Sequence, residues 1–253
     1  MIKIDFSAFE RISLKDMSNI RLMRRTDKKF IFPRDYLLQM FSSLSQDYFI
    51  QEIKNKNIFE YNTIYFDTPD YKMYRAHQNG KLNRIKVRTR EYVDSKLCFL
   101  EVKKKSNKGV TQKTRINYHQ TDLINEDGLP FLYSLIPYDP MLLEAKLCSK
   151  YNRITLINKE KTERVTIDLN LCFINNKTQR KIFLPEVVII EIKKEHSSFS
   201  PIMNNLNSLR IKPKGFSKYC IGVSLTENSA LIKTNNFKYK LKYLHKITSF
   251  DYE

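Results

Sequence analysis

The chain has 253 residues, with 45 Lys and Arg against 27 Asp and Glu, so its formal net charge is +18. That excess favours an anionic partner, and a hydrophobic content of 42% excludes a chain that is disordered throughout. With only 5 Gly the sequence carries neither Gly-rich nucleotide-binding motif, and it lacks both a secretory signal and an apolar run near the roughly 20 residues of a membrane-spanning helix.

The predicted elements are strands separated by short helices. After a helix and loop in the first twenty residues, strands are expected at 24–32, 48–53, 58–66, 82–92, 96–104, 111–118, 151–157, 164–173 and 187–194. Helices are expected at 34–44, 71–77, 122–134, 141–147, 200–209 and 216–225, and the tail from Asn235 is either a final helix or a poorly ordered extension. Short loops between the strands from 82 to 118 indicate an antiparallel meander.

This pattern favours one α+β domain over residues 1–253. No linker or solenoid repeat divides the chain, and many strands of similar length favour a closed barrel, since closure removes exposed edges. The four cysteines and four histidines are scattered, so we expect no zinc site, disulfide framework or His-based triad. A reducing, cytoplasmic location fits best, with any membrane association through a membrane-protein partner.

Charged side chains alternate with apolar ones along many of these strands. Arg84, Lys86, Arg88 and Arg90 share one strand face, because successive side chains point to opposite faces. The same alternation groups Asp27 with Lys29, Glu101 with Lys103, Lys113 with Arg115, Arg164 with Asp168, and Glu191 with Lys193. A solvated outer face explains any one strand. Six strands together favour a barrel with its charges inside.

Such an interior needs counter-charges or a polyanion. The carboxylates Asp27, Glu101, Asp168 and Glu191 supply some counter-charge, and they are oxygen ligands that Mg²⁺ or Mn²⁺ prefers. The pattern argues against nucleic acid as the partner, because the cations alternate with Ile, Val and Leu and are mixed with carboxylates rather than interleaved with exposed aromatics. A short phosphate chain bound with metal fits better.

An ordered set of short motifs carries a family resemblance. They are Arg-Thr-Asp-Lys-Lys-Phe (25–30), Tyr-Phe-Asp-Thr-Pro-Asp (65–70), Lys-Val-Arg-Thr-Arg-Glu-Tyr (86–92), Phe-Leu-Glu-Val-Lys (99–103), Lys-Thr-Arg (113–115), Tyr-Asn-Arg (151–153), Arg-Val-Thr-Ile-Asp (164–168), Ile-Glu-Ile-Lys (190–193) and Phe-Ser-Lys-Tyr (216–219). Over about residues 21–225 this set resembles the VTC domain, the polyphosphate polymerase domain of the vacuolar transporter chaperone family. That domain belongs to the triphosphate tunnel metalloenzymes, relatives of the CYTH group. Residues 226–253 form a basic C-terminal extension beyond the recognisable core.

The resemblance implies an eight-stranded antiparallel tunnel, with helices outside and at its ends, that holds triphosphate or polyphosphate. The catalytic residues it implies are Lys29, Arg88, Arg90, Lys103 and Arg153, and the phosphate-binding residues are Lys86, Lys113, Arg115, Tyr151, Arg164, Lys193, Ser217 and Lys218. Glu191 would hold Mn²⁺ or Mg²⁺, with Glu101 as a second candidate. Where the superfamily has two glutamates in its first strand, this chain has Arg25 and Asp27, which favours VTC over the CYTH phosphatases.

Three functions remain open from the sequence. The first is a metal-dependent polyphosphate polymerase that transfers the γ-phosphoryl group of a nucleoside triphosphate, expected to be ATP, to phosphate or a growing polyphosphate chain. The second is a triphosphatase or nucleoside triphosphatase using the same tunnel, with water as the acceptor. The third is a non-catalytic binder of polyphosphate or nucleic acid.

Overall fold

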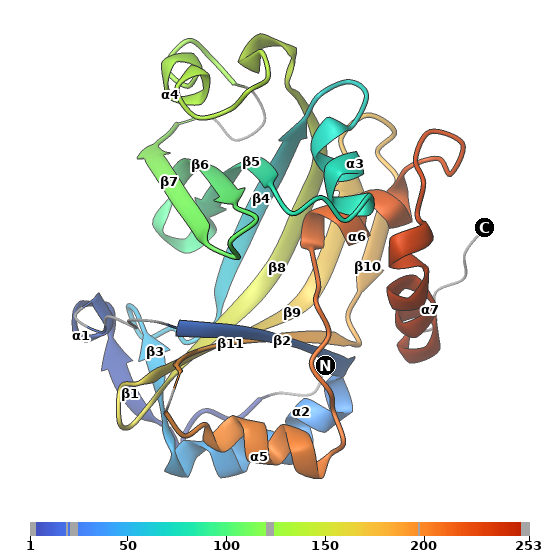
Figure 1. The fold of residues 1–253 in the computed structure, drawn as a ribbon. Helices are drawn as coiled ribbons and strands as arrows, with labels where there is room; N and C mark the ends of the chain where they lie inside the picture. Colours follow the sequence, from blue (N-terminus) through green and yellow to red (C-terminus); the bar gives the residue numbers. More distant parts are fainter. Residues whose placement is uncertain (1–3, 19, 21–24, 120–123, 197, 249–253) are drawn as a thin grey trace.

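A strongly curved, largely antiparallel β-sheet forms the centre of the computed structural model, which describes residues 4–18, 20, 25–119, 124–196 and 198–248 (Figure 1). The eleven strands are β1 (Glu10–Ser13), β2 (Arg25–Pro33), β3 (Tyr48–Glu52), β4 (Phe59–Asp67), β5 (Arg84–Tyr92), β6 (Leu97–Lys105), β7 (Thr111–Asn117), β8 (Glu144–Asn158), β9 (Glu163–Asn175), β10 (Lys181–Leu184) and β11 (Val187–Glu195). The helices are α1 (Leu14–Ser18), α2 (Arg34–Phe41), α3 (Lys72–Gln78), α4 (Leu129–Tyr133), α5 (Pro201–Ser208), α6 (Lys218–Thr226) and α7 (Lys238–Ile247), with short 3₁₀ turns η1 (Ser42–Gln46), η2 (Val93–Ser95), η3 (Pro140–Leu142) and η4 (Asn235–Phe237).

The prediction of a closed eight-stranded barrel was wrong in its closure and its strand count. Eight strands do follow one path, β2-β11-β9-β8-β4-β5-β6-β7, but its end strands β2 and β7 are not paired with each other over the described residues. Instead, the backbone N–H of Lys214 donates to the carbonyl of Lys29 at 2.7 Å, so the segment between α5 and α6 occupies part of the β2 edge. The three extra strands flank the path: β3 pairs with β8, β10 with β9, and β1 runs parallel to β3.

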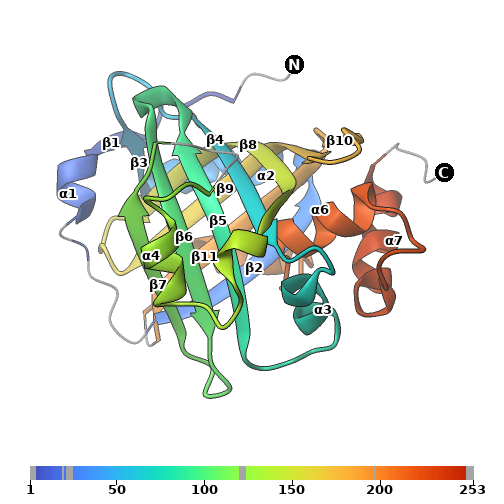
Figure 2. The same cartoon turned by 90° about the horizontal axis from the view of Figure 1, so that it is seen from above.

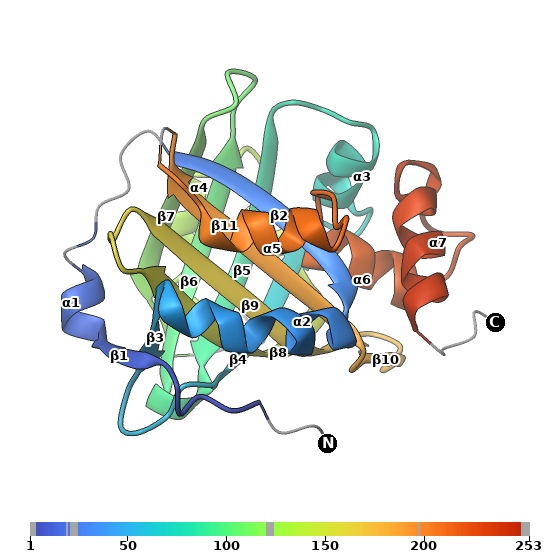
Figure 3. The ribbon, with the colours of Figure 1, turned by 90° about the horizontal axis from the view of Figure 1, so that it is seen from below.

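The curvature brings the two halves of the sheet face to face. Figure 1 shows the half that contains β5, β6 and β7 above the half that contains β2 and β11, with α4 over the top and α2 and α5 beneath. The same layers are seen from above in Figure 2, and Figure 3 shows α2 and α5 covering the underside. Phe30, Phe32 and Ile190 pack against residues of α2 and α5, while Val87 and Leu100 pack towards α4. The parts of the outer faces next to these helices are therefore apolar.

At one end of the sheet, the buried helix α6 covers the inner face between the two halves. Helix α6 packs there against Leu147 and Phe173, and all of its residues from Tyr219 to Thr226 are buried. A Cβ at Gly222 would lie 2.7 Å from the Phe173 ring, so the helix can approach this closely only with glycine. Asn170, at a positive φ of 53°, accompanies a bulge in β9, which turns Leu171 and Phe173 onto the inner face.

The sequence predictions for individual elements were confirmed for most of the sheet. The predicted helix at 141–147 was wrong: only a 3₁₀ turn precedes β8, which begins at Glu144 and pairs with β4. The short strands β1 and β10 were not predicted, and the basic tail forms helix α7. Arg24 and Asp122, where two predicted elements begin, lie outside the described residues, as does Arg21, the predicted start of the core. Within the described residues, no helix has the length and apolar character that crossing a bilayer requires.

Candidate phosphate-binding site

The predicted site residues lie in rows across the inner face. Residues directly opposite one another in antiparallel strands project from the same face. The rows are Lys113 with Lys103 and Lys86; Arg115 with Glu101 and Arg88; Arg90 with Thr63; Tyr61 with Tyr151; Arg153 with Asp168; Lys29 with Glu191 and Thr166; and Lys193 with Arg164. The predicted alternation of charged and apolar residues thus gathers the cations on the side away from the helix-covered outer faces.

Glu101 is the counter-charge on the inner face of strands β5, β6 and β7, which form one wall of the site. Arg88 donates from Nε and Nη2 to one oxygen of Glu101, at 2.8 and 2.6 Å, and Lys113 forms an ion pair with the other oxygen. Burial alone would raise the Glu101 pKa, but Arg88, Arg90 and Lys113 lower it to about 2. The carboxylate is therefore ionised and holds Arg88 in a fixed orientation. Arg115 lies at the exposed edge of this wall, with its guanidinium 4.3 Å from the centre of the Phe99 ring.

Asp168 is the corresponding counter-charge for the cations of β8 and α6. Arg153 binds it with two hydrogen bonds, of 2.6 and 2.9 Å, and Lys218 at the start of α6 forms an ion pair with it. The Tyr151 ring stacks on Tyr61 at 5.3 Å, beneath the guanidinium of Arg153. The buried hydroxyl of Tyr151 has no hydrogen-bond partner among the described residues, so it is available to a ligand.

Glu191 belongs to the strand pair β2–β11. The Lys29 Nζ lies 3.3 Å and the Lys193 Nζ 3.8 Å from the same Glu191 oxygen. Arg164 of β9 lies opposite Lys193 of β11. Burial would raise the Glu191 pKa, but the charges of Lys29 and Lys193, together with those of Arg153 and Lys103, lower it to about 2. Arg164 also donates to the Met17 carbonyl at 3.3 Å, which places its guanidinium near the N-terminal segment.

Lys86, Arg90 and Lys103 are inner-face cations that form no ion pair among the described residues. Lys86 donates to the Ser217 hydroxyl at 2.9 Å, and Arg90 donates to the Thr63 hydroxyl at 3.3 Å. The charge of Arg88 and the burial of the amine lower the Lys103 pKa to about 6, while burial lowers that of Lys86 to about 8. Cations held so close together without carboxylates indicate an anionic ligand.

The carboxylates suit a metal ion that binds together with a phosphate ligand better than a metal ion held by protein side chains alone. No cluster of three or more His, Cys, Asp or Glu side chains occurs within the described ranges. Glu191 is ionised and its side chain is 20% exposed, whereas Glu101 is fully buried with both oxygens engaged by cations. Mg²⁺ is commonly held by one or two carboxylates together with substrate phosphates. Glu191 therefore fits that role, and the assignment of Glu101 to a metal stays a prediction.

Two residues that the sequence reasoning did not single out also contribute. Tyr61 lies under the guanidinium groups of Arg153 and Arg90, at 4.9 and 5.6 Å from its ring centre. The buried hydroxyl of Thr166, beside Glu191, has no hydrogen-bond partner among the described residues. Strand alternation could have found both, because Tyr61 shares a face with Tyr65, and Thr166 shares one with Asp168.

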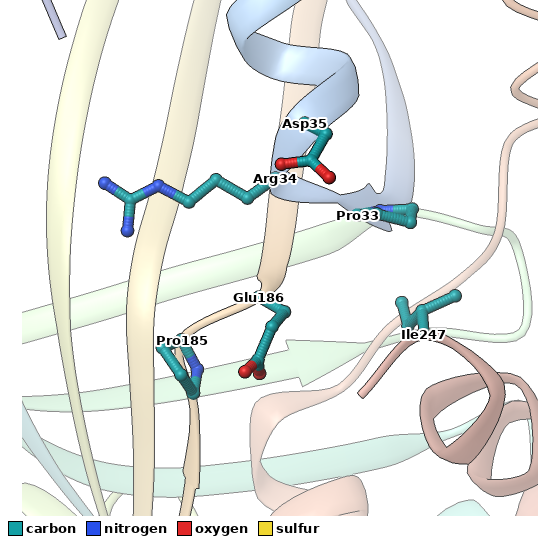
Figure 4. A pocket seen from close by; sticks show the side chains of 6 residues that line it. All are labelled: Pro33, Arg34, Asp35, Pro185, Glu186 and Ile247. Carbon is teal, nitrogen blue, oxygen red and sulfur yellow. The ribbon is translucent and has the colours of Figure 1, made fainter. Parts of the chain in front are cut away.

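Two surface pockets lie outside this face. One, of about 290 Å³, is lined by Pro33, Arg34, Asp35, Pro185, Glu186 and Ile247 (Figure 4). The other, of about 520 Å³, lies between the end of α6 and α7. Neither contains a predicted site residue, so they do not change the assignment of the inner face.

Comparison with known proteins gives the family. No curated protein matches the chain. Among solved structures, a Hippeastrum protein described as having a dominant triphosphatase activity is similar, with 13% identity, a TM-score of 0.46, and coverage of 80% of this chain and 96% of that one. A proposed adenylate cyclase from Vibrio parahaemolyticus has 13% identity and a TM-score of 0.45 over 81% and 99% of the two chains, and a Pyrococcus horikoshii protein has 12% and 0.43 over 79% and 99%. The VTC domain model matches residues 24–127 and 133–227, which is most of the sequence, and the chain therefore belongs to the VTC domain family.

Proposed function

We propose that this protein is a metal-dependent polyphosphate polymerase that uses a nucleoside triphosphate, ATP, as its phosphoryl donor. The observation that carries the proposal is the row of Lys86, Lys103 and Lys113, next to Arg88 and Arg90, on a face where cations greatly outnumber carboxylates. A chain of phosphates supplies the regularly spaced negative charge that such rows require. Membership of the VTC family supports the same activity.

The paired and unpaired cations have different roles in this proposal. Arg88 and Arg153 are held by buried carboxylates, so they present donors in fixed positions without reorganisation. Lys86, Arg90 and Lys103 form no ion pair within the described residues and would contact the phosphate oxygens directly. Tyr151 would donate its hydroxyl, and Ser217 and Lys218 would contribute from the start of α6.

The reaction needs positioning and charge neutralisation rather than a covalent enzyme intermediate. An oxygen of the acceptor phosphate forms a bond to the γ-phosphorus, the bond between that phosphorus and the β–γ bridging oxygen breaks, and nucleoside diphosphate leaves. Lys103 and Arg90 would neutralise charge on the transferred group, and Lys29 would orient Glu191. A Mn²⁺ or Mg²⁺ ion bound at Glu191 would supply further positive charge to the phosphate oxygens.

The test uses a pair of variants that differ only in strand face. Lys103→Met removes an inner-face cation, and Lys104→Met removes the next residue's cation from the opposite face. With ATP and Mn²⁺, we expect polymer on gels from the native protein and from Lys104→Met, but at least a hundredfold less from Lys103→Met. If the native protein releases free phosphate and makes no polymer, it is a hydrolase and not a polymerase. If it makes neither product but binds polyphosphate tightly, it is a non-catalytic binder.

A further inference from the structure

The inner-face rows of cations continue to the end of the sheet. Arg84 of β5 lies opposite Lys105 of β6, one row beyond Lys86 and Lys103 on the same face. Neither Arg84 nor Lys105 forms an ion pair within the described residues. The basic lining therefore does not stop at the site described above, but reaches the position where β5 begins and β6 ends.

Helix α7 brings another cation to this position. Its buried side chains Leu241 and Leu244, with Phe237 just before it, pack into the same apolar cluster as α6. Lys240 points back from α7, and its Nζ lies 3.9 Å from where a Cβ of Gly215 would be, on the segment that leads into α6. The Lys240 side chain is half-buried, and burial together with the charge of Arg84 lowers its pKa.

His77 lies between α6 and the segment that begins α7. Its Nδ1 lies 3.0 Å from the Sγ of Cys220, and its ring meets Phe237 edge-on at 5.7 Å. Burial lowers the His77 pKa to about 3, and the charges of Lys86, Arg84, Lys240 and Lys105 all act in the same direction. The imidazole is therefore neutral, and the surroundings of this residue are cationic on the sides of β5, β6 and α7.

We propose that Arg84, Lys105 and Lys240, which we call the basic mouth, bind an inorganic polyphosphate chain where it extends beyond the inner face. This rests on the proposed function and adds a second binding segment to it. The family match ends at residue 227, so α7 and its Lys240 lie beyond the matched residues. In this proposal a triphosphate lies on the Arg153 side of Lys103, and only a longer chain continues past Lys103 to the row of Arg84 and Lys105.

The experiment compares the binding of two ligands, tripolyphosphate and long-chain polyphosphate, by titration calorimetry. Lys240→Met should weaken long-chain binding about threefold to tenfold and leave tripolyphosphate binding unchanged. It should also reduce the slope of log affinity against log salt by about 0.7, as the loss of one phosphate contact does for single strands. Arg84→Met, on a different element, should show the same length dependence.

Lys242→Met is the matched control, because Lys242 is an exposed lysine of α7 that lies towards the pocket at the end of α6. It should bind both ligands like the native protein, and all variants should melt at the same temperature. If Lys240→Met binds long chains as Lys242→Met does, or loses affinity for both ligands equally, the basic mouth is overturned. If the native protein binds neither ligand, the proposed function itself fails, and the inference fails with it.

Discussion

Binding of polyphosphate should take up a proton at Lys103. In the ligand-free protein, the charge of Arg88 and burial lower the Lys103 pKa to about 6, so at about pH 8 the amine is mostly neutral. A phosphate chain beside the amine replaces repulsion by attraction and returns the pKa towards its usual value of about 10.4. Between about pH 8 and pH 6, affinity should therefore rise about tenfold for each unit by which the pH falls, and level off below about pH 6.

The number of protons taken up can be measured directly. Calorimetric titration with long-chain polyphosphate, in buffers of different ionisation enthalpy, should give close to one proton per site at about pH 7. Long chains suit this assay because their internal phosphates do not titrate near neutrality. Lys103→Met should abolish the uptake, and Lys104→Met on the opposite strand face should retain it. An uptake that persists in Lys103→Met would refute the reasoning, as would an affinity independent of pH in the native protein.

Three further substitutions separate stability from chemistry. Arg153→Met leaves Asp168, which is 2% exposed, with one cation fewer, and should lower the unfolding free energy in urea by about 2–4 kcal/mol; an unchanged value would show that water replaces the guanidinium. Glu191→Gln removes the counter-charge of two lysines, so metal-free tripolyphosphate binding should tighten while Mn²⁺-dependent turnover is lost, and weaker metal-free binding would contradict this. Gly222→Ala forces a methyl group against Phe173 and should cost about 1–3 kcal/mol in thermal unfolding, unless α6 can move away from the sheet.

The chemistry of the inner face could be predicted from the sequence because a strand repeats every two residues. In β5, Arg84 to Arg90 alternate cations with Ile, Val and Thr, so the pleat alone fixes which side chains share a face. The pairing of Arg88 with Glu101 follows only from the register of β5 against β6, which the loop between them sets. Whether the sheet closes into a barrel could not be decided from this alternation, because closure depends on which backbone groups hydrogen-bond to the free edge of β2.

The segment before β8 shows where local propensity misleads. Residues 141–147, Met-Leu-Leu-Glu-Ala-Lys-Leu, are all good helix formers, yet β8 begins at Glu144. Pairing with β4 places Ala145 opposite Phe66 and Leu147 opposite Tyr65, and the packing of these side chains outweighs the small helical preference. The bulge at Asn170 was equally hidden, since nothing local marks the residue as one that shifts the alternation of β9.

The same distinction between paired and unpaired cations makes ligand binding a stabilising event. Lys103 lies among like charges that Glu101 does not offset, so the folded protein binds fewer protons than the unfolded chain between about pH 6 and pH 10, and this group lowers stability there. Lys103→Met should therefore raise the melting temperature of the ligand-free protein at about pH 7. Tripolyphosphate at about 100 times its dissociation constant should stabilise the native protein by about 2.7 kcal/mol, a rise of roughly 5–10 °C. At matched ionic strength, chloride should give no such rise. If Lys103→Met melts below the native protein without ligand, then Lys103 is a packing residue of the wall, and repulsion on the inner face cannot be what the phosphate relieves.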